Sequence, residues 1–269
     1  MKIGLIAGGG QFPIIFSNIA KSKGYEVFAV AHIKETDPAL ENHVDMIRWI
    51  HLGQVKKLLN FFKENKVTEV AMLGKIKKTR IFSDFKPDTK ALKLIAGMRH
   101  THDDNVLRGL AGALEKEGIK VRSSTFLIPD ILATEGCWTK RKPSRAEKED
   151  MKLGWEIAKE IGKLDIGQCI VLCKGSVLAV EAIDGTDATI KRGGSLANNS
   201  AVVVKVAKPN QDLRFDVPAV GVETIMTMQE AGAGLLVLEA GKAVVFDKEE
   251  MIDCADRYGI SIIALENEN

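Results

Sequence analysis

Eleven residues in the last third of the chain gather side chains that could do chemistry. The segment 208–218 holds two carboxylates, Asp212 and Asp216, and two cations, Lys208 and Arg214, between flanking prolines. In an extended segment, positions 212, 214 and 216 point the same way, so the carboxylates would flank the guanidinium. Carboxylates bind hard divalent cations, and basic groups pair with phosphate. The segment indicates phosphate chemistry, with Asp212 and Asp216 as metal ligands; surface ion pairing is the alternative.

A second acidic group lies upstream. Glu181, Asp184 and Asp187 are spaced three apart and precede Lys191 and Arg192. Carboxylates in one turn repel each other, so a metal or a basic partner is expected nearby. The two cations could be that partner without any metal. The residues predicted to bind a ligand here are Glu181, Thr186, Asp187, Lys191 and Arg192.

Glycines follow two expected strands of the first half. Residues 8–10 are three glycines between an apolar run and a helical pattern, where backbone amides could approach an anion. The dinucleotide fingerprint fails because Pro13 stands where its third glycine would be. A tight turn that needs glycine only for steric reasons is the alternative. The predicted substrate-binding residues are Gly9, Gly10, Gln11, Gly74 and Lys75.

The elements that carry these loops alternate in the first half of the chain. Their apolar periodicity predicts strands at 2–7, 26–31, 69–73 and 119–122, with helices at 13–23 and 54–64 and another that begins near residue 103. This order is typical of an α/β fold with a parallel sheet. Residues 1–138 are therefore predicted to form a Rossmann-like N-terminal domain.

The composition changes between residues 139 and 150, which are almost all polar, and this predicts a domain boundary. Ser144 and Glu147 have the spacing of a capping box at the start of a helix. Apolar runs joined by short turns predict hairpins at 168–181 and 235–246, with helices at 222–232 and 248–258. Residues 139–269 are thus predicted to form a mixed α+β C-terminal catalytic domain.

The bulk composition excludes several classes of protein. The formal net charge is +2, so a broad nucleic-acid-binding surface is not expected. No apolar stretch approaches the roughly 20 residues that span a bilayer, and the chain starts without a leader pattern, which favours a cytoplasmic location. Cys169 and Cys173 would share one side of a strand, and four scattered cysteines indicate reduced thiols rather than a zinc site.

Five segments in order, 6–13, 165–168, 179–187, 205–218 and 238–242, resemble the UDP-2,3-diacylglucosamine pyrophosphatase family of the bacterial lipid A pathway. The resemblance is to the two-domain type and not to the calcineurin-like phosphoesterases. It spans nearly the whole chain. Asp184 stands where that family often has glutamate, and Asn210 stands where glycine is common.

This resemblance implies a Mg²⁺-dependent hydrolase that splits its lipid substrate into UMP and 2,3-diacylglucosamine 1-phosphate, with the substrate held between the domains. It implies an essential aspartate, Asp212 or Asp216, of which Asp212 ranks slightly first, and Lys208 and Arg214 would assist. Residues 8–11 would cradle the nucleotide or its phosphate. A homodimer and peripheral contact with the inner face of the cytoplasmic membrane are also expected.

Two other functions remain open from the residues alone. The glycine-rich first turn also suggests a nicotinamide-dependent oxidoreductase. A non-catalytic nucleotide-sugar sensor, in which the carboxylate motifs only hold a ligand, is the third possibility.

Overall fold

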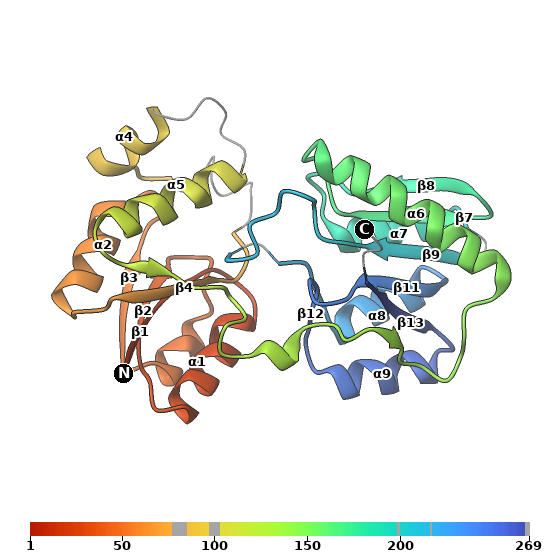
Figure 1. Ribbon diagram of the computed structural model, residues 1–269, viewed down its shortest axis with the longest axis horizontal. Helices are drawn as coiled ribbons and strands as arrows, with labels where there is room; N and C mark the ends of the chain where they lie inside the picture. Colours follow the sequence, from red (N-terminus) through yellow and green to blue (C-terminus); the bar gives the residue numbers. More distant parts are fainter. Residues whose placement is uncertain (77–84, 97–102, 198–199, 216, 267–269) are drawn as a thin grey trace. The chain divides into compact units, whose positions relative to one another are not determined.

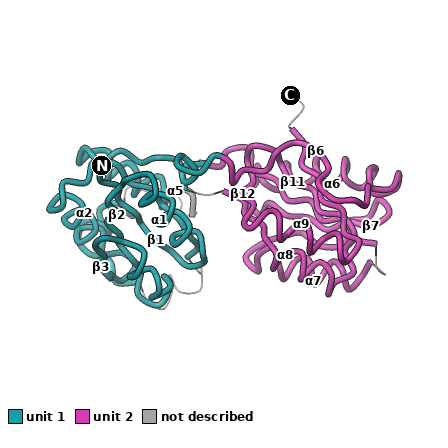
Figure 2. Tube along the Cα trace, turned by 90° about the horizontal axis from the view of Figure 1, so that it is seen from below, with its two compact units in different colours: residues 1–129, 212–216 teal, residues 130–211, 217–269 magenta. Residues whose placement is uncertain are grey.

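The computed structural model describes residues 1–76, 85–96, 103–197, 200–215 and 217–266, and the side chains of 103–105 lie outside this description. The chain forms two compact units, shown in teal and magenta in Figure 2. Unit 1 contains residues 1–129 together with 212–216, and unit 2 contains 130–211 and 217–269. One short segment of the second half therefore belongs to the first unit.

Unit 1 is built on a parallel five-stranded sheet with the strand order β3-β2-β1-β4-β5 (Figure 1). Alternate residues of each strand face opposite sides, so the sheet buries one apolar cluster on each face. Helix α1 packs in one cluster, and helices α2 and α5 pack in the other. The predicted Rossmann-like α/β architecture is confirmed. The elements are β1 (Lys2–Ala7), α1 (Phe12–Ser22), β2 (Glu26–His32), β3 (Met46–Ile50), α2 (Val55–Glu64), β4 (Glu69–Leu73), α4 (Thr89–Ala96), α5 (Asp103–Lys116) and β5 (Lys120–Val121), with a 3-10 helix at Pro38–His43.

Unit 2 contains a six-stranded mixed sheet with the order β6-β13-β11-β9-β7-β8. The three strands β13, β11 and β9 are parallel, and β6 and β7 run antiparallel to their neighbours. Helix α6 packs on one face, and α7, α8 and α9 pack on the other. The predicted mixed sheet domain is confirmed. The elements are β6 (Gly136–Cys137), α6 (Arg145–Lys163), β7 (Cys169–Cys173), β8 (Ser176–Val180), α7 (Thr186–Gly194), β9 (Ala201–Lys205), β10 (Ala219–Val220), α8 (Val222–Glu230), β11 (Ala233–Glu239), β12 (Val244–Val245), α9 (Lys248–Arg257) and β13 (Ser261–Leu265), after a 3-10 helix at Pro129–Ile131.

Of the two predicted hairpins, one is confirmed and the other is wrong. Strands β7 and β8 pair antiparallel across a short turn. The run 235–246 does not fold back on itself, because β11 pairs parallel with β9 and β13, while β12 pairs with β10 in a separate two-stranded sheet. The turn after β11 directs the chain away: Gly241 N donates to Ala133 O, and Ala240 N donates to Leu265 O.

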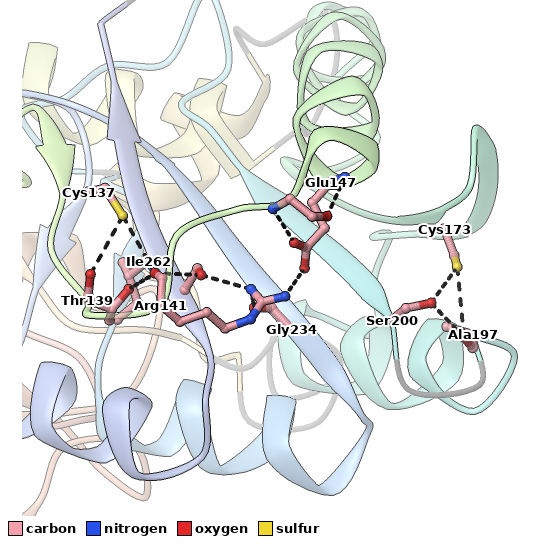
Figure 3. A network of polar contacts seen from close by, with 11 residues as sticks. Cys137, Thr139, Arg141, Glu147, Cys173, Ala197, Ser200, Gly234 and Ile262 are labelled. Atoms are coloured by element: carbon pink, nitrogen blue, oxygen red, sulfur yellow. Dashed lines mark hydrogen bonds and ion pairs between the residues drawn. The ribbon is translucent and has the colours of Figure 1, made fainter.

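The units divide between Pro129 and Asp130, whereas the polar composition placed the division between residues 138 and 139. The polar stretch is bound to the sheet of unit 2 rather than extended through solvent (Figure 3). Thr139 is buried, and its Oγ1 accepts from Ile262 N. Arg141 donates to Gly234 O, Ser261 Oγ and, at 2.7 Å, Glu147 Oε1.

Glu147 also completes the capping box that the sequence predicts. Its backbone N–H donates to Ser144 Oγ, and its Oε2 accepts from Ser144 N. Burial acts to raise the pKa of Glu147, but the Ser144 N–H and the Arg141 guanidinium outweigh it, so the pKa lies below its usual value. This carboxylate therefore stabilises unit 2 in its ionised form.

The four cysteines are free thiols, as expected. Cys169 and Cys173 both face the apolar cluster under α7, α8 and α9, and burial raises the pKa of Cys169. Within the described residues, no helix is long and apolar enough to span a bilayer.

Glu147→Gln tests the Arg141 contact. Glutamine retains the capping geometry and loses the ion pair, so the free energy of unfolding at pH 7 should fall by about 1 kcal/mol, given the partial exposure of Arg141. A carboxylate with a lowered pKa stabilises the fold above its unfolded pKa of about 4.3 and loses that effect as the pH falls through the folded pKa. Denaturant titrations should show the difference from wild type closing below about pH 4, and a constant difference would contradict the ion pair.

Candidate functional site

The two glycine loops of unit 1 lie side by side at the carboxyl edge of its sheet, where open α/β folds bind ligands. Gly8 N donates to Leu73 O at 2.7 Å, and Gly9 and Lys75 exchange two backbone hydrogen bonds of 2.8 and 2.9 Å. The structure thus brings together the predicted loops that follow β1 and β4. Helix α1 begins directly after them, with Gln11 as its N-cap and Pro13 in its first turn, as predicted.

Sterics account for three of these glycines. A Cβ on Gly8 would lie 2.7 Å from Lys75 O, one on Gly9 would lie 2.8 Å from Glu35 O, and one on Gly74 would lie 2.7 Å from Gly9 O. Gly10 differs, because its φ is +91° and no atom of the described residues lies within 4 Å of its Cβ position. The amides of Gly8 and Gly9 are used within the protein. Anion binding by this loop stays a prediction.

His32, at the end of β2, braces the same loop and was not chosen from the sequence. Its Nδ1 lies 2.9 Å from Ala7 O, which also accepts from Thr36 Oγ1 at 2.7 Å. Burial lowers the pKa of His32, which favours a neutral ring with Nδ1–H as the donor. A signal in the sequence could have pointed to His32, because it lies at the end of the second strand, where a dinucleotide-binding fold has an acidic residue.

The segment that carries Asp212 is a turn and not an extended strand, so the expected conformation is wrong, although Arg214 does lie beside Asp212 as expected. Phe215 N donates to Asp212 O, which closes the turn. The Arg214 guanidinium folds back onto Asp212, with Nη2 to Oδ2 at 2.8 Å and Nε to Oδ1 at 2.9 Å. Hydrogen bonds from Arg214 hold the pKa of Asp212 below its usual value. Asp216 lies outside the described residues.

This turn is attached to unit 1 by charge and by apolar packing. Arg214 Nη1 donates to Glu115 Oε1 of α5 at 2.8 Å. Phe215 is buried in the apolar cluster that α2 and α5 form on one face of the sheet. Glu115 was not predicted, and a single exposed glutamate on a helix offers no sequence signal.

The residues just before the turn are attached to unit 2. Lys208 Nζ forms an ion pair with Asp165, and Lys208 N donates to Gln211 Oε1 at 2.9 Å. Gln211 Nε2 donates to Gln168 Oε1 at 3.1 Å. Asp165 and Gln168 belong to the segment 165–168 that carried part of the resemblance, so two motifs that are distant in sequence are in contact here.

The acidic group 181–187 is divided among separate partners. Glu181 is buried and accepts from Thr186 Oγ1 and Gln168 N. Asp184 pairs with Arg192 at 2.6 Å. Asp187 lies in the first turn of α7, an element that the sequence analysis missed, and Lys191 pairs with Glu230. Among the described residues, no three acidic, histidine or cysteine side chains form a metal-binding group.

The loops singled out by sequence thus follow carboxyl-terminal strand ends in both units. Lys205 ends β9 before the segment 208–218, and β8, which runs parallel to β9 through β7, ends before Glu181. Glu239 ends β11. This placement defines a two-unit α/β protein with polar loops at the ligand-binding edges of its sheets.

Comparison with known proteins identifies its family. Models of the LpxI N-terminal and C-terminal domains match residues 2–131 and 134–263. The UDP-2,3-diacylglucosamine pyrophosphatase LpxI of Caulobacter vibrioides is 31% identical in an alignment that covers 98% of each chain. The chain belongs to the LpxI family.

More distant similarities add nothing to this assignment. The bifunctional purine biosynthesis protein PurH of Bacillus cytotoxicus is 24% identical over 155 residues, 55% of this chain and 25% of that protein. Among solved structures, the CobK precorrin-6A reductase aligns over 100% of this chain and 89% of its own at 10% identity, with a TM-score of 0.32.

Gly74→Ala and Gly10→Ala together test the close approach of the glycine loops. Their φ angles are nearly equal, +93° and +91°, so both variants bear the same backbone cost of about 1 kcal/mol. Only Gly74→Ala adds an overlap with the backbone of Gly9, and we expect it to lose about 3 kcal/mol in total by denaturant unfolding. Equal losses in the two variants would disprove the steric reason for glycine at position 74.

Proposed function

We propose that this protein hydrolyses the pyrophosphate bond of UDP-2,3-diacylglucosamine and releases UMP and 2,3-diacylglucosamine 1-phosphate in lipid A biosynthesis. The observation that carries the proposal is the family membership over nearly the whole chain, with a relative named for this activity. The nicotinamide-dependent oxidoreductase is not favoured, since both domain models belong to one pyrophosphatase family.

Asp212 is the carboxylate we assign to the reaction among the described residues. It is ionised, because Arg214 lowers its pKa, and its side chain retains 16% exposure. Arg214 is itself balanced by Asp212 and Glu115, so its first role is to fix the orientation of the Asp212 carboxylate. Nε donates to both Asp212 oxygens, Nη2 to Asp212 Oδ2 and Nη1 to Glu115 Oε1. A guanidinium has five N–H groups, so Nη1 and Nη2 each keep one for a phosphate oxygen.

Magnesium dependence is part of the proposal. Mg²⁺ is usually bound by one or two carboxylates together with substrate phosphates and water, and an ionised aspartate fits that donor set. Asp212 would hold the ion, with Asp216 as the second ligand. When bound, the ion would neutralise charge on the diphosphate and orient water.

Lys208 has a different local role from Arg214. Its ion pair with Asp165 and the hydrogen bond of its backbone to Gln211 stabilise the bend before the turn. We propose that the Lys208 ammonium pairs with a phosphate of the substrate only when it leaves Asp165. The acyl chains of the substrate favour peripheral membrane contact, and the cytoplasmic location and the homodimer stay predictions.

Separate Asp212→Ala and Asp216→Ala variants, assayed for UMP release with and without Mg²⁺, test the function and its site. We expect wild-type hydrolysis only with the metal and a loss of about a hundredfold or more in kcat for the essential aspartate. Glu149→Ala removes an exposed carboxylate of α6 that pairs only locally with Arg145 among the described residues, and it should retain wild-type activity.

Three other results would contradict the assigned site or favour another function. Full activity in both aspartate variants would exclude the assigned site. Tight binding of the UDP-sugar without turnover under any divalent metal would favour the sensor. Thermal protection by NAD(P) but not by UDP-sugars would favour the oxidoreductase.

A further inference from the structure

A buried ion pair lies at the carboxyl edge of the sheet in unit 2, where the chain leaves β9. The Glu239 carboxylate ends β11 and is fully buried. Its Oε2 accepts from Lys159 Nζ at 2.5 Å, and its Oε1 lies 2.9 Å from Lys242 Nζ without the angle of a hydrogen bond. Lys159 belongs to α6 and is only 14% exposed.

The pair holds both backbone polar groups of one residue, Ala207, on the route to the turn. Ala207 N donates to Glu239 Oε2 at 2.9 Å, and Ala207 O accepts from Lys159 Nζ at 3.0 Å. Ala207 immediately precedes the segment 208–218. The ion pair therefore fixes the position and direction in which that segment departs from the sheet.

The returning end of the segment has a buried charge of its own. Lys205, the last residue of β9, is 4% exposed, and its Nζ donates to Ala219 O at 2.7 Å. Ala219 begins β10, which pairs with β12. The departure at Ala207 and the return at Ala219 are thus both held by side chains at the same sheet edge.

Stability alone does not account for charges in this position. Burial lowers the pKa of Lys159, and the Glu239 carboxylate offsets this only in part, whereas the ammonium groups of Lys159 and Lys242 hold the pKa of Glu239 below its usual value against burial. Replacing a buried ion pair with apolar side chains is often neutral or stabilising. What apolar side chains could not supply is a donor for Ala207 O and an acceptor for Ala207 N in fixed directions.

We propose that Lys159 and Glu239 are positioning residues for the reaction, which hold the segment 208–218 so that the turn at 212–215 presents Asp212 in its reactive geometry. The inference deepens the proposed function and rests on it. Misplacement of a reacting group by about 1 Å can reduce a rate about a hundredfold. A loosened departure at Ala207 should therefore impair kcat more than substrate binding.

Lys159→Met and Glu239→Asp are the test variants. Methionine keeps the apolar stem of Lys159 and removes the donor to Ala207 O, while aspartate keeps the charge and withdraws it by roughly 1.5 Å. Glu147→Gln is the matched control, because it breaks another partly buried ion pair of unit 2, for which no contact with the described residues of the segment 208–218 is found. We expect a fall in kcat of about tenfold or more with KM changed less than threefold in both test variants, and unchanged kcat in the control.

Hydrogen exchange supplies a readout that does not depend on activity. The amides of Gln211, Arg214 and Phe215 are protected by hydrogen bonds within the bend and the turn. They should exchange faster in Lys159→Met and Glu239→Asp and at the wild-type rate in Glu147→Gln. Glu239→Gln, which keeps the shape of the side chain, replaces Glu239→Asp if that variant fails to fold.

The outcomes separate this inference from the proposed function. Wild-type kcat with unchanged exchange in the test variants would overturn it, and so would an equal loss of kcat in the Glu147→Gln control at matched thermal stability. Absence of UMP release by the wild-type protein would defeat the proposed function instead. In that case, unchanged exchange at residues 211–215 would independently show that the pair does not position the segment.

Discussion

The structure depends on one constraint, which is that a short turn must be held in place although its neighbours in sequence belong to another unit. Residues 212–216 belong to unit 1, while 211 and 217 belong to unit 2. Holding a loop in one conformation costs conformational entropy, so a loop without anchors would not keep Asp212 in one orientation. The chain limits that loss by anchoring the turn within unit 1 through Phe215 and Arg214, and its flanks within unit 2 through Ala207 and Ala219.

The anchors use charged groups where an ordinary core would use apolar ones. Glu239 and Lys205 are buried and the side chain of Lys159 is only 14% exposed, and each has as a partner an opposite charge or a backbone group at the flanks of the segment 208–218. Directional bonds to a backbone fix an orientation, which apolar packing does only weakly. The same logic applies to His32 and Thr36, which hold Ala7 O at the start of the glycine loop.

The elements that depend on neighbouring residues could be predicted from the sequence. The strand and helix alternation of unit 1, the Ser144 capping box and the β7–β8 hairpin all follow from neighbouring residues. The predicted hairpin at 235–246 was wrong because a short turn does not determine which strand becomes the partner. Strand β11 pairs in parallel with β9 and β13 instead. The extended form of the segment was wrong because Phe215 N donates to Asp212 O and closes a turn, while the contact of Arg214 with Asp212 is one that a strand would also allow. Glu115 and Lys159 became visible only through tertiary contacts.

The glycine loop of unit 1 shows how internal bonding restricts where a phosphate can bind. Gly8 N donates to Leu73 O at the end of β4, and Gly9 N donates to Lys75 O just beyond it. Pro13 has no amide hydrogen, and Ile14 and Ile15 donate to Gln11 O. The first turn of α1 keeps the positive end of a helix dipole, but most of the nearby donors are already committed. An anion at this edge would therefore have to bind close to Gly10 and Gln11, where the open space beside Gly10 allows approach to the backbone. The steric need for glycine and the predicted anion binding would thus be carried by different residues of one loop.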